Sequence, residues 1–118
     1  MLDELTIYQK YIDLIYYTNK LITKYPKSER YNLVNEIKNI TYKGIRLIIE
    51  AQKDKNSRTE ILNKLDTNLK YLIVLIRVSY KNKYISIKNY KTWSYKITII
   101  NNLMIGWLKV AKNNKKYI

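Results

Sequence analysis

The sequence predicts an all-α protein, an antiparallel up-down bundle of four helices in one domain. Its 118 residues suit a single domain with a single core. Two glycines, one proline and no cysteine leave few turn signals, which favours a few long helices over many short strands. Four segments also carry apolar residues at alternating steps of three and four, as bundle helices do. We expect helices at about residues 4–25, 28–52, 57–81 and 86–113.

The first two helices are expected to meet at a polar turn around Pro26, because proline cannot continue a helical hydrogen-bond ladder. The expected core row of the first helix is Leu5, Tyr8, Ile12, Ile15, Asn19 and Ile22. That of the second is Leu33, Ile37, Ile40, Gly44, Ile48 and Ala51. A glycine in the middle of a helix costs about 1 kcal/mol relative to alanine, so Gly44 indicates a close helix crossing.

The third helix follows a short polar connection, Lys53 to Asn56, which favours an antiparallel neighbour. Ser57 and Glu60 have the spacing of a capping box. The expected core row is Leu62, Leu65, Leu69, Leu72, Ile76 and Ser79. Tyr71, Leu75 and Val78 add a second apolar row, so we expect the second half of this helix to be buried nearly all round.

The fourth helix is expected to begin at Ser86, with Ile85 and Tyr90 positioned as a hydrophobic staple. Its expected core row is Tyr90, Trp93, Ile97, Ile100, Met104, Trp107 and Ala111. Ile99, Leu103, Gly106 and Val110 lie beside this row. Extra apolar faces on the third and fourth helices predict self-association, although a wide core face on a small bundle is the alternative.

Neither the composition nor the motifs indicate catalysis. The chain has no histidine and no cysteine, which removes the commonest general base, nucleophile and transition-metal ligands. The nine acidic residues are scattered, and no glycine-rich phosphate loop is present. We therefore expect no enzyme activity, cofactor, metal site or small-molecule substrate.

The charge of the chain points to an acidic partner. The formal net charge is +14, and from Lys81 onwards nine lysines stand without a single acidic residue. At 100° per residue, five lysines of the fourth helix fall opposite its core row and form a basic ridge: Lys88, Lys91, Lys109, Lys112 and Lys116. Lys70, Arg77 and Lys81 extend the positive charge onto the third helix. These eight residues are the candidate nucleic-acid contacts, with a solvated lysine face as the alternative.

Two further expectations concern the tyrosines and the cellular compartment. Most of the 13 tyrosines fall near core rows, and we expect Tyr17, Tyr84 and Tyr117 to be the exposed ones. The absence of cysteine and of a signal-like or membrane-spanning segment favours the cytoplasm and no membrane contact.

Between about Tyr8 and Lys112, the chain resembles the four-helix-bundle accessory variability determinants of diversity-generating retroelements. That family is related to small bundle proteins encoded in intervening sequences of bacterial 23S ribosomal RNA. The resemblance depends on the order and spacing of short motifs, namely Gln9 to Leu14, Pro26 with Arg30, Tyr31 and Leu33, Glu50 with Ala51, Leu65 with Asp66, Ile85 with Ser86, Tyr90, and Gly106 with Trp107 and Lys109.

The resemblance implies a homopentamer that binds the element's reverse transcriptase and its template RNA or cDNA, in support of error-prone copying that diversifies a target gene. It places family arginines of the third helix at Arg77 and, with a shifted alignment, at Lys70. The runner-up function is a protein-interaction scaffold whose basic face binds an acidic partner. The third is a bundle protein of a ribosomal RNA intervening sequence.

Overall fold

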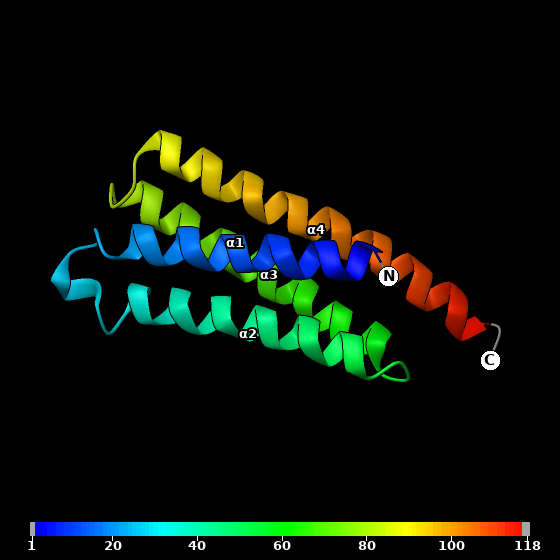
Figure 1. Cartoon of the computed structure of the whole chain (residues 1–118). Helices are drawn as coiled ribbons and strands as arrows, with labels where there is room; N and C mark the ends of the chain where they lie inside the picture. Colours follow the sequence, from blue (N-terminus) through cyan, green and yellow to red (C-terminus); the bar gives the residue numbers. More distant parts are fainter. Residues whose placement is uncertain (1, 117–118) are drawn as a thin grey trace.

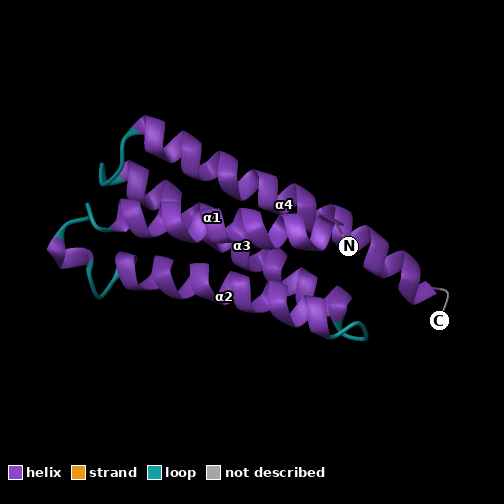
Figure 2. Ribbon diagram, viewed as in Figure 1, coloured by secondary structure: helices purple, strands orange, loops and turns teal. Residues whose placement is uncertain are grey.

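A computed structural model describes residues 2–116, with the side chains of residues 4–114. Over this range the regular structure is entirely helical, as Figure 2 shows, so the predicted all-α class is confirmed. The elements are α1 (Leu2–Ile22), the short 3-10 helix η1 (Lys27–Glu29), α2 (Leu33–Lys53), α3 (Arg58–Lys81) and α4 (Ile87–Lys116).

The four helices form an elongated up-down bundle of 51 × 25 × 20 Å (Figure 1). Each long helix packs against the next one in the chain, and α4 also packs against α1 and closes the ring. The longest helix, α4, extends beyond the N-terminal end of α1 (Figure 1). The chain therefore encloses one core, and every long helix keeps an outer face in solvent.

The predicted core rows of α3 and α4 are confirmed. All six predicted residues of α3, from Leu62 to Ser79, are buried. Six of the seven predicted residues of α4 are buried, and Tyr90 is half-buried. The helical period identified the buried row on both helices, although both also carry exposed apolar residues outside it. The second half of α3 is not buried all round, however, because Tyr71, Val74 and Val78 are exposed.

The predicted core row of α1 is wrong except at Ile22, which is buried as expected. The residues that the bundle buries are Ile7, Tyr11, Leu14, Thr18, Leu21 and Ile22, whereas Leu5 is exposed. Both rows contain a polar residue at the same level, Thr18 in one and Asn19 in the other. The buried indole Nε1 of Trp93 donates to Thr18 Oγ1 at 3.0 Å, and this partner places Thr18 inside. Asn19 lies at the edge, where its amide donates to the Tyr42 hydroxyl.

Helix α2 begins at Leu33 rather than Ser28. Residues 27–29 form η1 instead, and Asn32 breaks the helix with a φ of −111° and a ψ of −101°. The connection is held to the α3–α4 turn, since the Tyr25 ring packs on Tyr84 with centroids 5.5 Å apart. Burial of Tyr25 raises the pKa of its hydroxyl to about 12.

Gly44 provides the close helix crossing that was predicted. The position that a Cβ would occupy is filled by the ring end of Tyr11 from α1. The Tyr11 hydroxyl donates to the carbonyl of Thr41 at 2.7 Å, one turn earlier on α2. Since Tyr11 is fully buried, α1 and α2 are joined there by a hydrogen bond inside the core.

The two predicted N-terminal caps have different outcomes. Ser57 precedes α3 but makes no side-chain cap bond, so the predicted capping box is absent. Its backbone N–H donates instead to Asp54 Oδ1 at 3.0 Å, and Glu60 is exposed. Ser86 does cap α4, because its Oγ accepts from the backbone N–H of Asn89 at 3.0 Å.

The turn between α3 and α4 ends α3 with a left-handed residue. Lys83 has a φ of 64°, and its N–H donates to Tyr80 O while that of Tyr84 donates to Ser79 O. This pair of bonds is the Schellman motif, which usually has glycine at that position. Just outside the turn, the rings of Tyr80 and Tyr90 stack with centroids 4.8 Å apart and join α3 to α4.

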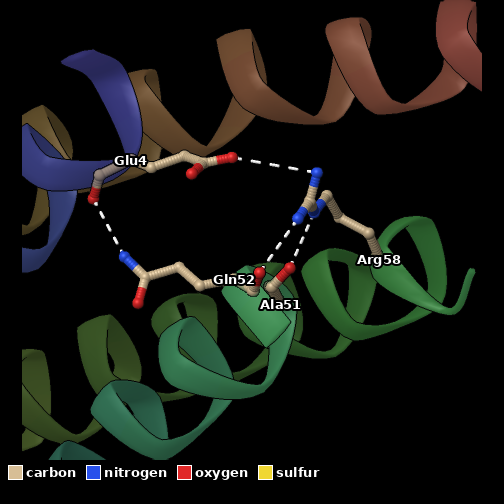
Figure 3. A network of polar contacts seen from close by, with 4 residues as sticks. All are labelled: Glu4, Ala51, Gln52 and Arg58. Carbon is tan, nitrogen blue, oxygen red and sulfur yellow. Dashed lines mark hydrogen bonds and ion pairs between the residues drawn. The ribbon is translucent and has the colours of Figure 1, made fainter. Parts of the chain in front are cut away.

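At the opposite end of the bundle, Arg58 of α3 contacts the other three helices, and Figure 3 shows its contacts with α1 and α2. Its guanidinium donates to the carbonyls of Ala51, at 2.6 Å, and Gln52, at 3.1 Å, which end α2. It also lies 3.8 Å from the Glu4 carboxylate on α1 and 5.5 Å from the centroid of the Trp107 ring on α4. Arg58 therefore acts as the C-terminal cap of α2 in place of backbone or water.

Two further properties follow from the described residues. Among them, no helix is long and apolar enough to cross a membrane. Over the same range, acidic side chains do not gather into a group of three that could hold a metal ion.

Candidate nucleic-acid interface

The outer face of α4 carries the predicted lysines. Lys88, Lys91, Lys109 and Lys112 are all exposed on the side away from the core row. The side chain of Lys116 lies outside the described side chains, although the helix continues through that residue. The outward placement expected from the helical period is thus correct for the four lysines that are described.

These lysines form two groups rather than one continuous ridge. Lys91 and Lys109 are 18 residues apart, which corresponds to about 27 Å along a helix. The outer face between them is uncharged and includes the exposed residues Tyr95, Ile105 and Gly106. A polyanion along α4 would therefore meet positive charge at both ends of the helix and uncharged surface in the middle.

The three candidate residues of α3 are not equivalent. Lys70 is exposed, but its ammonium is ion-paired with the Asp66 carboxylate one turn earlier. Arg77 and Lys81 are exposed and make no ion pair with a described acidic group. A screened pair such as Lys70 with Asp66 contributes little net positive potential, so Arg77 and Lys81 are the stronger candidates.

The exposed cations described after Lys70, on α3, α4 and the turn between them, form two groups, and the larger lies at one end of the bundle. We use the name hairpin patch for five exposed residues around the α3–α4 turn: Arg77, Lys81, Lys83, Lys88 and Lys91. Lys109 and Lys112 form the second group, the tail patch. The last acidic residue of the sequence is Asp66. The rest of α3 after this residue, and all of α4, therefore carry no acidic side chain.

The α1–α2 connection adds cations to the same end, which the candidate set from sequence omitted. It is tied to the α3–α4 turn because the Tyr84 hydroxyl donates to Glu29 Oε2 at 2.8 Å, and this bond raises the pKa of Tyr84. Exposed Lys24, Lys27 and Arg30 are thereby held at the end that carries the hairpin patch. Their contribution arises from tertiary packing between segments about 55 residues apart in sequence.

The expectation for exposed tyrosines is wrong for the two that are described. Tyr17 is half-buried, lies edge-on to Trp93 with centroids 6.4 Å apart, and is covered by the Lys96 ammonium. Tyr84 is also half-buried against the α1–α2 connection, while Tyr117 lies outside the described residues. Among the described tyrosines, the most exposed are instead Tyr31, Tyr16 and Tyr95, at 83%, 72% and 66%.

The predicted association surface is only partly available on the chain. Gly106 and Val110 of α4 and Tyr71 and Val78 of α3 are exposed. Ile99 and Leu103 are half-buried, and Leu103 packs on the core. Leu75 is buried within the chain and presents almost no surface to a partner.

A further apolar face, which the sequence did not reveal, lies across α1 and α2. Leu5 and Ile49 are exposed there, and Ile12 and Ile45 are half-buried. The bonds from Gln52 to Glu4 O and from Tyr11 to Thr41 O fix the antiparallel register that brings these residues to the same levels. Leu5 and Ile12 had been assigned to the core row of α1, which is why this face was not expected.

A comparison with protein-family models gives one match over most of the chain. The bAvd-like family model matches residues 5–111, which include every buried residue of the hydrophobic core. No curated protein matches the chain.

Proposed function

The chain belongs to the bAvd-like family, and from this premise we propose that it is a retroelement accessory protein that binds reverse transcriptase and template RNA or cDNA. The observation that carries the nucleic-acid part is the acid-free stretch after Asp66, in which Arg77 and all the described lysines except Lys96 are exposed. Phosphate contacts of this kind release counterions and need no base-specific geometry. The protein's role would then be to hold nucleic acid for a polymerase that performs the chemistry.

The two patches suit a phosphate backbone that touches the bundle at separated points. Their spacing along α4, about 27 Å, corresponds to roughly eight base-pair steps of duplex at 3.4 Å per step. Arginine is scarce on this surface, with Arg77 the one arginine among the candidate residues. The preference is therefore for charge and shape rather than for a base sequence.

Replacing Lys88, Lys91, Lys109 and Lys112 together by glutamine is expected to weaken binding of a structured RNA about tenfold or more at 100 mM salt, while the helical content stays unchanged. The reason is that all four ammonium groups are exposed and none contributes to the core. The slope of log K against log salt should fall by about 3, since each lost phosphate contact removes about 0.7 to 0.9. Fluorescence anisotropy across a salt series measures both quantities.

The matched control replaces four exposed lysines elsewhere, namely Lys10, Lys43, Lys53 and Lys64, by glutamine. Both variants lower the formal net charge from +14 to +10. Equal losses of affinity in the two variants would show that net charge, rather than the α4 patches, governs binding.

A protein-interaction scaffold is the second candidate function, favoured by the uncharged middle of the α4 outer face. Tyr95, at 66% exposed, and Ile105 offer apolar contact area between the two lysine groups. Such a surface fits a partner protein with an apolar centre and acidic edges. Weak RNA binding even at low salt, with retained binding to a purified partner, would favour this candidate over the first.

Self-association through α4 is part of the first proposal, and Gly106 supports it. This glycine lies inside a helix, where it costs about 1 kcal/mol relative to alanine. A Cβ at this position would meet no atom of the chain within 4 Å, so packing within the chain does not explain the glycine. Leu103 and Val110 flank it at steps of three and four, which places a bare backbone site between two apolar side chains. Close approach by a second copy is the explanation we propose, with a pentamer as the family-based expectation.

Gly106→Ala is expected to stabilise the dilute chain by up to about 1 kcal/mol and to weaken its self-association about tenfold. The gain follows from helix propensity, and the loss follows from a methyl group placed in a close helix contact. Chemical denaturation at low concentration measures the first effect, and light scattering over a concentration series measures the second.

Asn63→Ala is the control, because Asn63 is an exposed position on α3 where alanine also favours the helix. It should stabilise the chain slightly and leave association unchanged. If Gly106→Ala were to leave the association constant unchanged, Gly106 would lie outside the contact between copies.

A further inference from the structure

A groove lies between the C-terminal end of α1, the η1 connection and the first turns of α2. Figure 1 shows this connection at one end of the bundle. Its volume is about 540 Å³, which is within the range of about 300 to 1,000 Å³ that is usual for small-ligand sites. None of the α4 lysines lines it, although it shares Lys27 and Arg30 with the cationic end of the bundle described above.

The rim of the groove is cationic. Lys27, Arg30 and Lys38 line it, all three are exposed, and none pairs with a described acidic group. No lining residue is acidic. The acidic side chain of the same connection, Glu29, is engaged elsewhere, because its Oε2 accepts the hydrogen bond from the Tyr84 hydroxyl. An anion in the groove would thus meet three free positive charges and no local carboxylate.

The interior of the groove is apolar and partly aromatic. Ile22, Tyr25 and Val34 line it and are at least nine-tenths buried. They belong to the core cluster and are therefore fixed in place. Tyr42 forms part of the wall; the residue is 45% exposed, and its hydroxyl accepts from the Asn19 amide at 3.2 Å. This wall offers a planar face next to two groups that donate and accept hydrogen bonds.

A second groove, at the other end of the bundle, differs in the state of its cation. It also contains a guanidinium, that of Arg58, but this group is already occupied by the Ala51 and Gln52 carbonyls and by Glu4. The cations of the α1–α2 groove make no comparable side-chain bonds within the described part of the chain. Their free charges are available to a ligand, whereas those of Arg58 stabilise the fold.

We propose that the α1–α2 groove binds a nucleoside phosphate, with the base against Tyr42 and the apolar floor and the phosphate between Arg30 and the two lysines. A flat apolar wall beside a cationic rim matches a ligand that has a planar body and an anionic end. This nucleoside phosphate is either a free mononucleotide or an unpaired nucleotide of a longer strand. An acidic peptide would satisfy the rim but would leave the aromatic wall without a planar partner.

The test is isothermal titration of the full chain with adenosine monophosphate, uridine monophosphate, adenosine and inorganic phosphate. Both monophosphates should bind more tightly than phosphate or adenosine alone, because only they contact the wall and the rim together. Arg30→Gln combined with Lys38→Gln should weaken the monophosphates tenfold or more. Tyr42→Leu should weaken the monophosphates severalfold while leaving inorganic phosphate unchanged.

The matched control is Lys20→Gln combined with Lys43→Gln, which removes the same charge from exposed positions of α1 and α2 that do not line the groove. It should change the affinities less than twofold. Circular dichroism of each variant verifies that the helices remain folded.

A short single-stranded oligonucleotide and an acidic peptide complete the test. If the oligonucleotide binds and the monophosphates do not, and the Arg30 and Lys38 variant abolishes this binding, the source is an unpaired nucleotide of a strand. Equal affinities for phosphate and monophosphates, or binding of the acidic peptide alone, would overturn the proposal. Duplex binding through the α4 patches is measured separately with the α4 variant, so each proposal can fail without the other.

Discussion

Gly44→Ala is expected to destabilise the bundle by about 3 kcal/mol, which lowers the melting temperature by roughly 10 °C for a chain of this length. The added methyl group would occupy the space that is filled by the ring end of Tyr11. Tyr11 is fully buried, and its hydroxyl donates to Thr41 O at 2.7 Å, so its ring cannot shift away from the added methyl group without losing this bond. Overpacking costs about 1 to 3 kcal/mol and an unsatisfied buried hydroxyl about as much again, against a gain of about 1 kcal/mol in helix propensity. Thermal and denaturant unfolding measure the change.

The double variant Gly44→Ala with Tyr11→Leu separates this contact from a general effect on α2. Leucine removes the ring that the methyl group would meet, so the two substitutions together should cost at least about 1.5 kcal/mol less than the sum of the single changes. Gly106→Ala is the contrasting case, because the same substitution at an open position should stabilise the dilute chain. An unchanged free energy of unfolding in Gly44→Ala would mean that α1 and α2 can separate there without losing packing.

The two glycines illustrate what the sequence reveals and what it hides. Both lie within helices, and the helical pattern identifies each as a position that needs a reason other than conformation. The pattern led to the correct reason for Gly44, a close crossing, because the residue falls in a core row. It could not identify Tyr11 as the residue in the gap, since the expected row of α1 omitted Tyr11.

Sequence periodicity located the core rows of α3 and α4, which run from Leu62 to Ser79 and from Trp93 to Ala111 and are buried as expected. Both helices also carry exposed apolar residues outside these rows, such as Val78 and Val110. On α1, apolar residues occur on all sides, and two rows differ mainly in whether Thr18 or Asn19 faces inwards. The Trp93 indole decides this by its need for a buried acceptor, which is a contact across 75 residues.

The sequence predicted that the candidate lysines face outwards, but it did not predict which other residues lie beside them. The outward placement of Lys88 and Lys109 follows from the helical period, which needs no tertiary information. The hairpin patch gains its neighbours from the α1–α2 connection through the bond between Tyr84 and Glu29. The pairing of Lys70 with Asp66 also changes its contribution, although their i,i+4 spacing was a signal for this pair in the sequence.

Arg58→Ala is expected to cost about 3 kcal/mol, and this effect arises from a residue that the sequence did not single out. The guanidinium supplies donors to the Ala51 and Gln52 carbonyls, which have no partner within α2. Hydrogen bonds from a charged donor contribute about 1.5 to 3 kcal/mol each. The contact with Trp107 adds about 0.5 to 1 kcal/mol. The ion pair with Glu4 adds little, because its atoms are 3.8 Å apart and near solvent. Denaturant unfolding of the purified chain measures the loss.

Two variants, Arg58→Lys and Lys55→Ala, separate the effect of the hydrogen bonds that cap α2 from the effect of the positive charge. Lysine keeps the positive charge, but an ammonium cannot reach both carbonyls and lie flat on the Trp107 ring in the way that a planar guanidinium does. We therefore expect Arg58→Lys to lose about half of the stability that Arg58→Ala loses. Lys55 is an exposed cation in the same connection, and its replacement by alanine should change the unfolding free energy by less than about 0.5 kcal/mol. Full stability in Arg58→Lys would show that the charge alone holds the ends of the four helices together, and that the two carbonyls are satisfied by water.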